Sequence, residues 1–145
     1  MIEVRPVPAP ATRPLRQRVL RPHQTLEELA HPWEALPGTG SFAAFVDGVM
    51  VGTAVVFPES RPGSTSAGPW RLVALAVDPA HRRRGVGAAL LEECRDHVRS
   101  NGGDEVWCHA RLGVVGFYED AGFVVEGEEW SEDHTGPHVL MWRRA

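Results

Sequence analysis

The sequence predicts a single α/β domain in which strands and helices are intermixed, with hairpins at both ends and one strand–helix–strand crossover in the middle. Its 145 residues fit one domain that can bury a core without disulfides or a structural metal. Two β-rich runs meet at Asp47-Gly48, which is a short-range hairpin signal. Further along, an apolar run over 72–77 precedes a helical pattern over 85–100, and this order indicates the crossover.

The N-terminal segment predicts one strand and two helices. Residues 2–7 form a β-rich run that prolines end. Residues 11–20 fit an amphipathic helix, which Pro22 stops. The apolar side of that helix consists of Leu15, Val19 and Leu20. Thr25 is placed to cap a second, short helix that extends to residue 30.

The middle of the chain predicts the first hairpin and a buried strand. The two strands of the hairpin are expected over 41–46 and 49–57. Residues 59–69 are rich in Pro, Gly and Ser and predict a mobile loop. The run over 72–77 is continuously apolar, which is typical of a strand that is buried on both faces.

The helix over 85–100 has an apolar stripe at helical spacing, formed by Gly87, Leu90, Leu91, Cys94 and Val98. Asn101-Gly102-Gly103 ends it, because these residues tolerate a left-handed backbone. Strands are then expected over 105–109, 123–130 and 138–143. A short helix over 114–121 precedes Gly122, and the last two strands surround a turn that contains Gly136-Pro137.

The composition excludes several classes of protein. The chain is 43% hydrophobic and 23% charged, with a net charge of −4, which is ordinary for a globular domain and unfavourable for a broad electrostatic grip on nucleic acid. No run of about 18 apolar residues is present, so neither a membrane span nor a secretory signal is predicted. The two cysteines are expected to be reduced core thiols, and the expected location is the cytoplasm.

The segment from 72 to 98 has the order of an anion-binding loop: a strand, three arginines (82–84), and Gly85-Val86-Gly87 opening a helix. Glycines let the backbone approach a ligand, and a helix N-terminus directs unpaired N–H groups toward it. A triphosphate P-loop needs a lysine, but all 15 basic side chains are arginine. A dinucleotide fingerprint needs a third glycine where this chain has Leu90, and that interpretation is weak.

The loop resembles the coenzyme A pyrophosphate loop of the GNAT superfamily of acyl-CoA-dependent N-acyltransferases, whose signature is Gln/Arg-x-x-Gly-x-Gly/Ala. The later segment ARLGVVGFYEDAGF resembles the same family's Phe-Tyr-x-x-x-Gly-Phe motif, although Arg111 stands where the family often has asparagine. The resemblance covers about 41–143. It implies one N-acetyltransferase domain over 1–145, with a mixed, mostly antiparallel sheet of six to seven strands that is splayed at its centre. About four helices would cover both faces of the sheet.

The resemblance also implies site residues for acetyl-CoA. The backbone of Leu75, Ala76 and Val77 would run beside the pantetheine arm, and the Val77 N–H would hold the developing oxyanion. The pyrophosphate would bind main-chain N–H groups of a loop that comprises Arg82, Arg83, Arg84, Gly85, Val86, Gly87 and Ala88. Of the three arginines, we expect Arg82 or Arg83 at the pyrophosphate, another near the 3′-phosphate, and at least one solvated.

Tyr118, the only tyrosine, falls on the second motif, and its implied role is proton donor to the departing thiolate. A phenol of ordinary pKa would make full transfer to a thiolate uphill by about 2 kcal/mol. For the general base we weigh Glu128 and His138, which come from the last two predicted strands. Five acids over 126–133 without a cation favour a cationic acceptor.

The expected function is therefore direct transfer of an acetyl group from acetyl-CoA to a primary amine of a small molecule or peptide N-terminus. The alternative is a non-catalytic acyl-CoA-binding sensor of the same fold. Cys108 and His109 do not predict a metal site, because adjacent strand residues point to opposite faces. No nucleic-acid or membrane partner is expected, and a homodimer is a possibility through pairing of the strand that carries Trp142.

Overall fold

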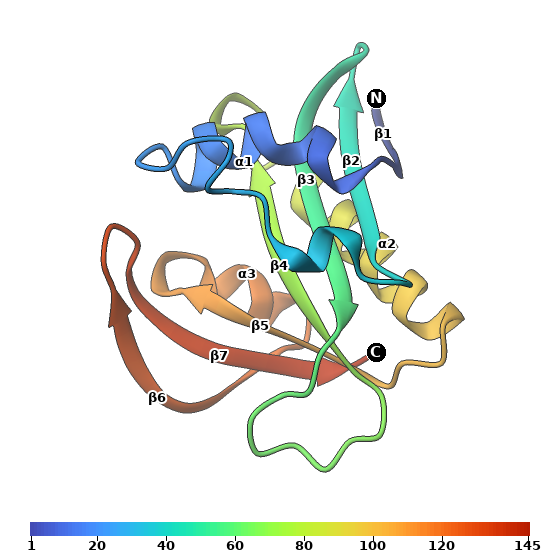
Figure 1. Cartoon of the computed structure of the whole chain (residues 1–145), viewed down its shortest axis with the longest axis vertical. Coiled ribbons are helices and arrows are strands. Elements are labelled where there is room, and N and C mark those ends of the chain that lie inside the picture. Colours follow the sequence, from blue (N-terminus) through green and yellow to red (C-terminus); the bar gives the residue numbers. More distant parts are fainter.

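The computed structural model describes all residues, 1–145, and contains one mixed seven-stranded sheet (Figure 1). The strands lie in the order β1-β2-β3-β4-β5-β7-β6, and only the β4–β5 pair is parallel. This confirms the predicted mixed, mostly antiparallel sheet. The strands are β1 (Ile2–Pro6), β2 (Gly40–Val46), β3 (Val49–Pro58), β4 (Pro69–Val77), β5 (Glu105–Arg111), β6 (Val124–Glu132) and β7 (Gly136–Arg144).

The chain has three α-helices where about four were expected. They are α1 (Arg13–Leu20), α2 (Val86–Ser100) and α3 (Val115–Asp120), with 3-10 turns at η1 (Ala9–Thr12), η2 (Pro32–Ala35), η3 (Pro79–His81) and η4 (Leu112–Val114). The missing helix is the one expected after Thr25, where residues 26–29 form turns. Thr25 and Glu28 do make a reciprocal capping box, at 2.9 and 3.1 Å. The segment is too short to propagate a helix before Pro32, which disfavours helical geometry in the residue before it.

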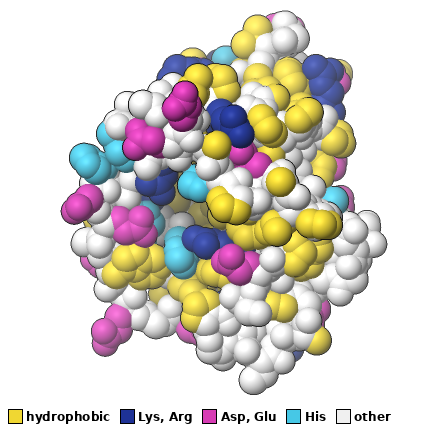
Figure 2. All heavy atoms as spheres, viewed as in Figure 1, with side chains coloured by type: hydrophobic (Ala, Val, Ile, Leu, Met, Phe, Trp, Pro, Cys, Tyr) yellow, Lys and Arg dark blue, Asp and Glu magenta, His cyan; other side chains and the backbone are white.

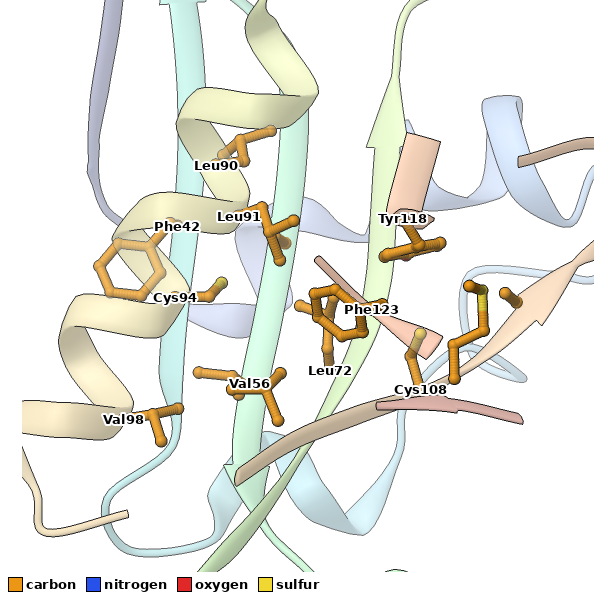
Figure 3. Close-up of a cluster of buried hydrophobic side chains, with 14 of the residues drawn as sticks. Phe42, Val56, Leu72, Leu90, Leu91, Cys94, Val98, Cys108, Tyr118 and Phe123 are labelled. Carbon is orange, nitrogen blue, oxygen red and sulfur yellow. The ribbon is translucent and has the colours of Figure 1, made fainter. Parts of the chain in front are cut away.

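Helices cover both faces of the sheet, as expected. In Figure 1, α1 crosses in front of β3 and β4, whereas α2 runs behind the sheet. The predicted apolar stripe of α2 forms the centre of the core, because Leu90, Leu91, Cys94 and Val98 are all buried. Figure 3 shows these side chains pointing at strand residues such as Val56. None of the helices combines the length and the apolar character needed to span a bilayer.

The sheet splays open at its centre. Strands β4 and β5 pair only where residues 69–71 face residues 105–107, and beyond that point they diverge. The composition of β4 predicted a strand that is buried on both faces, and this prediction is wrong. Leu72 and Ala76 are buried against the core, but Val73 is only half-buried because the other face borders an open cleft.

A bulge in β4 lies at the splay. The pairing of β3 with β4 shifts register between Thr53 and Val55, and Ala74 opposite it adopts a left-handed backbone with φ of 56°. The Thr53 hydroxyl donates to the Ala74 carbonyl at 2.9 Å, which holds the bulge. Bulges bend a strand and redirect its backbone groups, so this one shapes the edge of β4 that faces the cleft.

The β3–β4 loop, expected to be mobile, is fastened to the sheet by Arg61. This side chain is 6% exposed and binds the Glu105 carboxylate through two hydrogen bonds of 2.9 and 3.0 Å. It also pairs with Glu126 and lies over the Trp142 ring, 4.3 Å from its centroid. The prediction of mobility rested on the Pro, Gly and Ser content of the loop. Such a composition does not show contacts with residues that are distant in sequence.

The hairpins show one confirmed turn and one corrected turn. Asp47 and Gly48 both have positive φ, 50° and 79°, as the predicted two-residue turn requires. The last turn lies at residues 133–135, and Gly136 and Pro137 already belong to β7. Strand β7 pairs with β5 on one side and β6 on the other. The Trp142 strand therefore has no free edge, and the expected pairing through it across a dimer is wrong.

Candidate active site

A cleft of about 750 Å³ opens where β4 and β5 diverge. Its walls are the inner edges of these strands, the loop and first turn of α2, and helix α3, while α1 and the segment after it close the front. Figure 2 shows the hollow on this face, with apolar side chains inside and arginine and histidine side chains around it. A deep, largely apolar cavity with a few polar groups is the usual form of a small-molecule site.

The wall at the start of α2 is the predicted anion loop. Arg83 and Gly85 both have left-handed backbones, with φ of 63° and 80°, so the loop turns sharply into the helix N-terminus. Such turns gather backbone N–H groups into an anion-binding concavity. A Cβ on Gly87 would lie 3.2 Å from the Phe117 ring, which shows how closely the helix approaches α3 here.

Most of the residues predicted for this loop line the cleft. They are Arg82, Arg83, Gly85, Val86, Gly87 and Ala88. All three arginines are exposed, and Arg84 is the one that does not line the cleft. His81, which the sequence did not single out, lies beside the loop in the cleft wall.

The inner edge of β4 supplies free backbone groups. Leu75, Ala76 and Val77 all line the cleft, and this edge has no strand partner beyond residue 71. On the outer edge, the Asp78 N–H donates to the Val51 carbonyl at 2.8 Å. Successive N–H groups of a strand point to opposite edges, so the Val77 N–H points into the cleft. Its role as an oxyanion donor stays a prediction.

Tyr118 reaches the cleft from α3, but it is mostly enclosed by the core. It is 6% exposed and packs edge-on against Phe117 and Phe123, with ring centroids 5.1 and 5.3 Å away. Figure 3 shows it above Cys108. Burial, and then interaction with Cys108, raises the pKa of Tyr118 well above its ordinary value. Its hydroxyl is therefore a hydrogen-bond donor and a weaker acid than a free phenol.

Cys108 and His109 point to opposite faces of β5, as expected. Cys108 is buried beside Tyr118, and burial raises the pKa of its thiol to about 12, so it stays protonated. His109 faces the cleft, where its Nδ1 lies 3.1 Å from an Arg71 guanidinium nitrogen. Because an arginine can only donate, Nδ1 is the acceptor and the ring is neutral. Desolvation, and then the charge of Arg71, lowers the pKa of His109.

The structure separates the two candidates for the general base. His138 is 4% exposed and lines the cleft, and its Nδ1 lies 2.8 Å from the Gly136 carbonyl. A carbonyl can only accept, so Nδ1 carries the proton, and in the neutral ring Nε2 has the free lone pair. Glu128 is exposed and lies outside the lining of the cleft. His138 therefore lies in the cleft and Glu128 lies outside its lining, and the role of either as the base stays a prediction.

A wide bulge in β6 explains the position of Glu128. Glu126 pairs with Leu140 and Trp130 pairs with His138, so residues 127–129 lie in an irregular stretch that Gly127 opens with φ of 81°. Simple alternation along a strand would put Glu126 and Glu128 on one face. The bulge takes Glu128 out of the regular strand ladder, and of the β6 residues after it only Glu132 lines the cleft.

Only one of the five hairpin acids lines the cleft, so they do not form a cation-binding surface there. That acid is Glu132, which the sequence did not distinguish from its neighbours although it has the same parity as Glu128. The Trp130 indole N–H donates to it at 2.9 Å, and this hydrogen bond, with a smaller effect of His138 at 4.0 Å, lowers the pKa of Glu132. Glu126 instead pairs with Arg61, on the other side of the bulge.

The N-terminal segment adds a wall to the cleft, from α1 and the residues after it. Its members that line the cleft are Arg16, Val19, Leu20, Arg21, Leu29, His31 and Trp33. Arg16 is 2% exposed, binds Glu34 at 2.8 Å and lies over the Trp33 ring at 5.0 Å. Across the cleft, Arg111 donates to the Leu20 carbonyl at 2.7 Å and so ties β5 to the end of α1.

The splayed sheet, the anion loop and the cleft that both of them line define the class of protein as one with the fold of N-acetyltransferases. The ribosomal-protein-S18-alanine N-acetyltransferase from Escherichia coli superposes with a TM-score of 0.76 at 21% identity, over 99% of this chain and 94% of that chain. An aminoglycoside 6′-N-acetyltransferase, solved as a complex with coenzyme A, superposes with a TM-score of 0.70 at 16% identity, over 98% and 96% of the chains.

The chain belongs to the acetyltransferase (GNAT) family, whose model matches residues 10–123. Among curated proteins it is similar to the uncharacterized N-acetyltransferase YitI of Bacillus subtilis (strain 168), at 30% identity over 143 residues. That similarity covers 99% of this chain and 96% of the relative. The resemblance inferred from the two motifs is therefore confirmed, and the fold and family support an acyltransferase.

Proposed function

We propose that this protein transfers an acetyl group from acetyl-CoA to a primary amine of a small molecule or peptide N-terminus, by direct attack while both substrates are bound. The observation that carries the proposal is the meeting of three features in one cleft: the free inner edge of β4, the anion loop of α2, and the polar pair Tyr118 and His138. The coenzyme A complex of the aminoglycoside 6′-N-acetyltransferase with this fold supports the choice of donor.

The proposed donor fits the cleft at two places. The N–H groups of the loop from Arg82 to Gly87 would bind the pyrophosphate, with Arg82 and Arg83 adding charge. The free edge of β4 at Leu75 and Val77 would pair with the amides of the pantetheine arm as an added strand does. Acetyl-CoA supplies the thioester carbonyl, which the Val77 N–H would polarise.

The proposed chemistry forms one carbon–nitrogen bond and breaks one carbon–sulfur bond. The amine proton would pass to Nε2 of His138, directly or through a water, because Nδ1 is already committed to the Gly136 carbonyl. The Tyr118 hydroxyl would donate a hydrogen bond to the departing thiolate. Since burial raises the pKa of Tyr118, complete proton transfer from it is less favourable than from an ordinary phenol, and its contribution is the hydrogen bond.

The test measures thiol release from acetyl-CoA with a panel of primary amines. Tyr118→Phe keeps the buried ring, so the variant is expected to fold and bind coenzyme A while its kcat falls by about 10- to 100-fold, at or below the usual range for a catalytic acid. Gly87→Val, whose side chain would meet Phe117, should weaken binding of coenzyme A, whereas Gly116→Ala has open space and serves as the control. Tight binding without turnover of any amine would indicate the acyl-CoA sensor instead.

The base is tested by a matched pair of variants. His138→Gln can keep the hydrogen bond to the Gly136 carbonyl but has no titratable nitrogen. We therefore expect kcat to fall and the acidic limb of its pH profile to disappear. Glu128→Gln, outside the cleft, should leave the pH profile unchanged. The opposite pattern would assign the proton to Glu128 and refute the role proposed for His138.

A further inference from the structure

The half of the cleft opposite the anion loop has an unusual set of charges. The charged side chains that line it are Arg16, Arg21, Arg71, Arg111 and Glu132. Two of these arginines are neutralised outside the cleft, because Arg16 binds Glu34 at 2.8 Å and Arg71 binds Glu59 at 3.0 Å. The charges left over are those of Arg21, Arg111 and Glu132, so this half of the cleft is cationic.

Arg21 and Arg111 both line this half of the cleft, and neither forms an ion pair with a carboxylate. Neither has a carboxylate within 4.0 Å. Both are half-buried, one at the end of α1 and the other at the end of β5. The Arg111 hydrogen bond to the carbonyl of Leu20, the residue before Arg21, brings the two arginines to the same part of the cleft. Burial, and then the charge of Arg21, lowers the pKa of Arg111, and Glu132 has a smaller opposite effect.

The contacts within the protein leave most of this hydrogen-bonding capacity unused. Arg111 gives one hydrogen bond, to the Leu20 carbonyl at 2.7 Å, although a guanidinium carries five N–H donors and no acceptor. Two partly desolvated like charges in one part of a cleft are unfavourable unless an anion joins them, and Glu132 acts on both without forming an ion pair. Planar guanidinium groups match the oxygen atoms of carboxylates and phosphates.

We infer that the acceptor is an amine that also carries an anionic group, a carboxylate or a phosphate, which Arg21 and Arg111 hold while the amine lies toward Glu132 and His138. This rests on the proposed function, and it replaces the cationic acceptor that the acid-rich hairpin had indicated. Glu132 is the one carboxylate in this half of the cleft, and its position beside Trp130 and His138 gives the amine end a matching partner.

The arrangement is held from outside the pocket, which suits a small acceptor of fixed length. The His23 and His134 rings stack with centroids 4.3 Å apart and join the segment after α1 to the β6–β7 turn. Arg111 makes a second link between β5 and α1. The two arginines that would bind the anion are therefore connected through packed elements to Glu132 and His138, toward which the amine would lie.

The experiment compares acceptors that differ only in the anion. Initial rates of thiol release from acetyl-CoA are measured for a panel of amino acids against their carboxamides, and for phosphoethanolamine against ethanolamine, with spermidine as the cationic acceptor. Each enzyme is the full chain, as wild type, Arg21→Gln, Arg21→Lys, or Arg99→Gln, which removes the same charge from the far end of α2. Binding of N-acetylglycine and N-acetylglycinamide is measured in parallel by calorimetry.

For the wild type, kcat/KM should favour the anionic member of a pair by about 10- to 100-fold, the range of charge-assisted hydrogen bonds. Arg21→Gln should remove most of this preference through KM, with the neutral acceptors unaffected, and Arg21→Lys should restore part of it. Arg99→Gln should behave as wild type. The relative rates of the amino acids and phosphoethanolamine identify the anion.

The inference is overturned if neutral or cationic amines react as well as the anionic ones, or if Arg21→Gln slows both members of each pair equally. It is also overturned if N-acetylglycine binds no better than its amide. A different failure belongs to the proposed function: if no amine is acetylated but N-acetylglycine still binds more tightly than its amide in an Arg21-dependent way, the anion site stands without the transferase.

Discussion

The fastening of the β3–β4 loop by Arg61 is open to a quantitative test, in which Arg61 is replaced by methionine. The substitution keeps an unbranched side chain of similar length that can still cover the Trp142 ring, but it removes the guanidinium. Glu105, whose side chain is 4% exposed, then loses two hydrogen bonds of 2.9 and 3.0 Å. Only the Ser64 hydroxyl, at 3.3 Å, remains as a donor.

The expected loss follows from the burial of the stranded carboxylate. Breaking a buried ion pair by removing one partner costs about 3–5 kcal/mol, because the remaining charge is uncompensated. Loss of the cation–π contact to Trp142, at 4.3 Å, adds about 0.5–2 kcal/mol, part of which the methionine contact offsets. We therefore expect Arg61→Met to lower the free energy of unfolding by about 3–5 kcal/mol.

The double variant Arg61→Met/Glu105→Leu separates this cost from any general damage to the loop. Replacing a buried ion pair by apolar side chains is often neutral or stabilising, so the double variant should lie within about 1 kcal/mol of the wild type and above both single variants. Urea unfolding followed by tryptophan fluorescence gives the three differences, provided that the slope with denaturant is unchanged.

Two results would refute the reasoning. A loss below about 1 kcal/mol in Arg61→Met would mean that Glu105 is solvated and that the loop is not fastened. A double variant that is less stable than either single variant would mean that the site needs its polar groups for a reason other than mutual compensation of charge.

Three further predictions concern backbone strain, packing and pH. Ala74→Gly should raise the free energy of unfolding by up to about 1 kcal/mol in thermal or urea unfolding, because it relieves a left-handed alanine; a clear loss would contradict the strain. Gly103→Ala should destabilise by about 1–3 kcal/mol, since its Cβ would lie 2.5 Å from the Val98 side chain, whereas Gly113→Ala, with open space, should not. Burial lowers the pKa of His31, and desolvation together with the charge of Arg71 lowers the pKa of His109. Below the histidine pKa of the unfolded chain, about 6.5, the unfolded chain therefore binds more protons than the folded chain. The free energy of unfolding should therefore fall as the pH drops from about 7.5 to 5.5, less steeply in His109→Gln, and a pH-independent value would refute this.

The parts of the site that are local in sequence could be predicted. The anion loop needs only consecutive residues, because Gly85 opens the helix directly after the arginines and its left-handed backbone is intrinsic to glycine. Tyr118 was placed by a motif within one short helix. The apolar stripe of α2 likewise follows from helical periodicity, which does not depend on the partner it packs against.

Some predictions that depended on contacts between distant segments failed, and others were not possible. Glu128 was weighed as a base in the site, but it lies outside the cleft because of the bulge at Gly127, which is a property of how β6 registers against β7. The loop that carries Arg61 was expected to be mobile from its composition. Its contact with Glu105, 44 residues away, was not visible in the sequence. Composition could not show which of several acids a buried arginine would meet.

By itself, the sequence determined the order of elements, the anion loop, the tyrosine and the family, since each depends on neighbouring residues and their backbone preferences. The tertiary structure alone decided which side chains share the cleft. It places Glu132 and His138 in the lining of the cleft and Glu128 outside it, and it brings Arg111 to the end of α1, 91 residues away. The physical reason is that the face of a strand depends on register, and register is fixed only when the strands pair and the core closes.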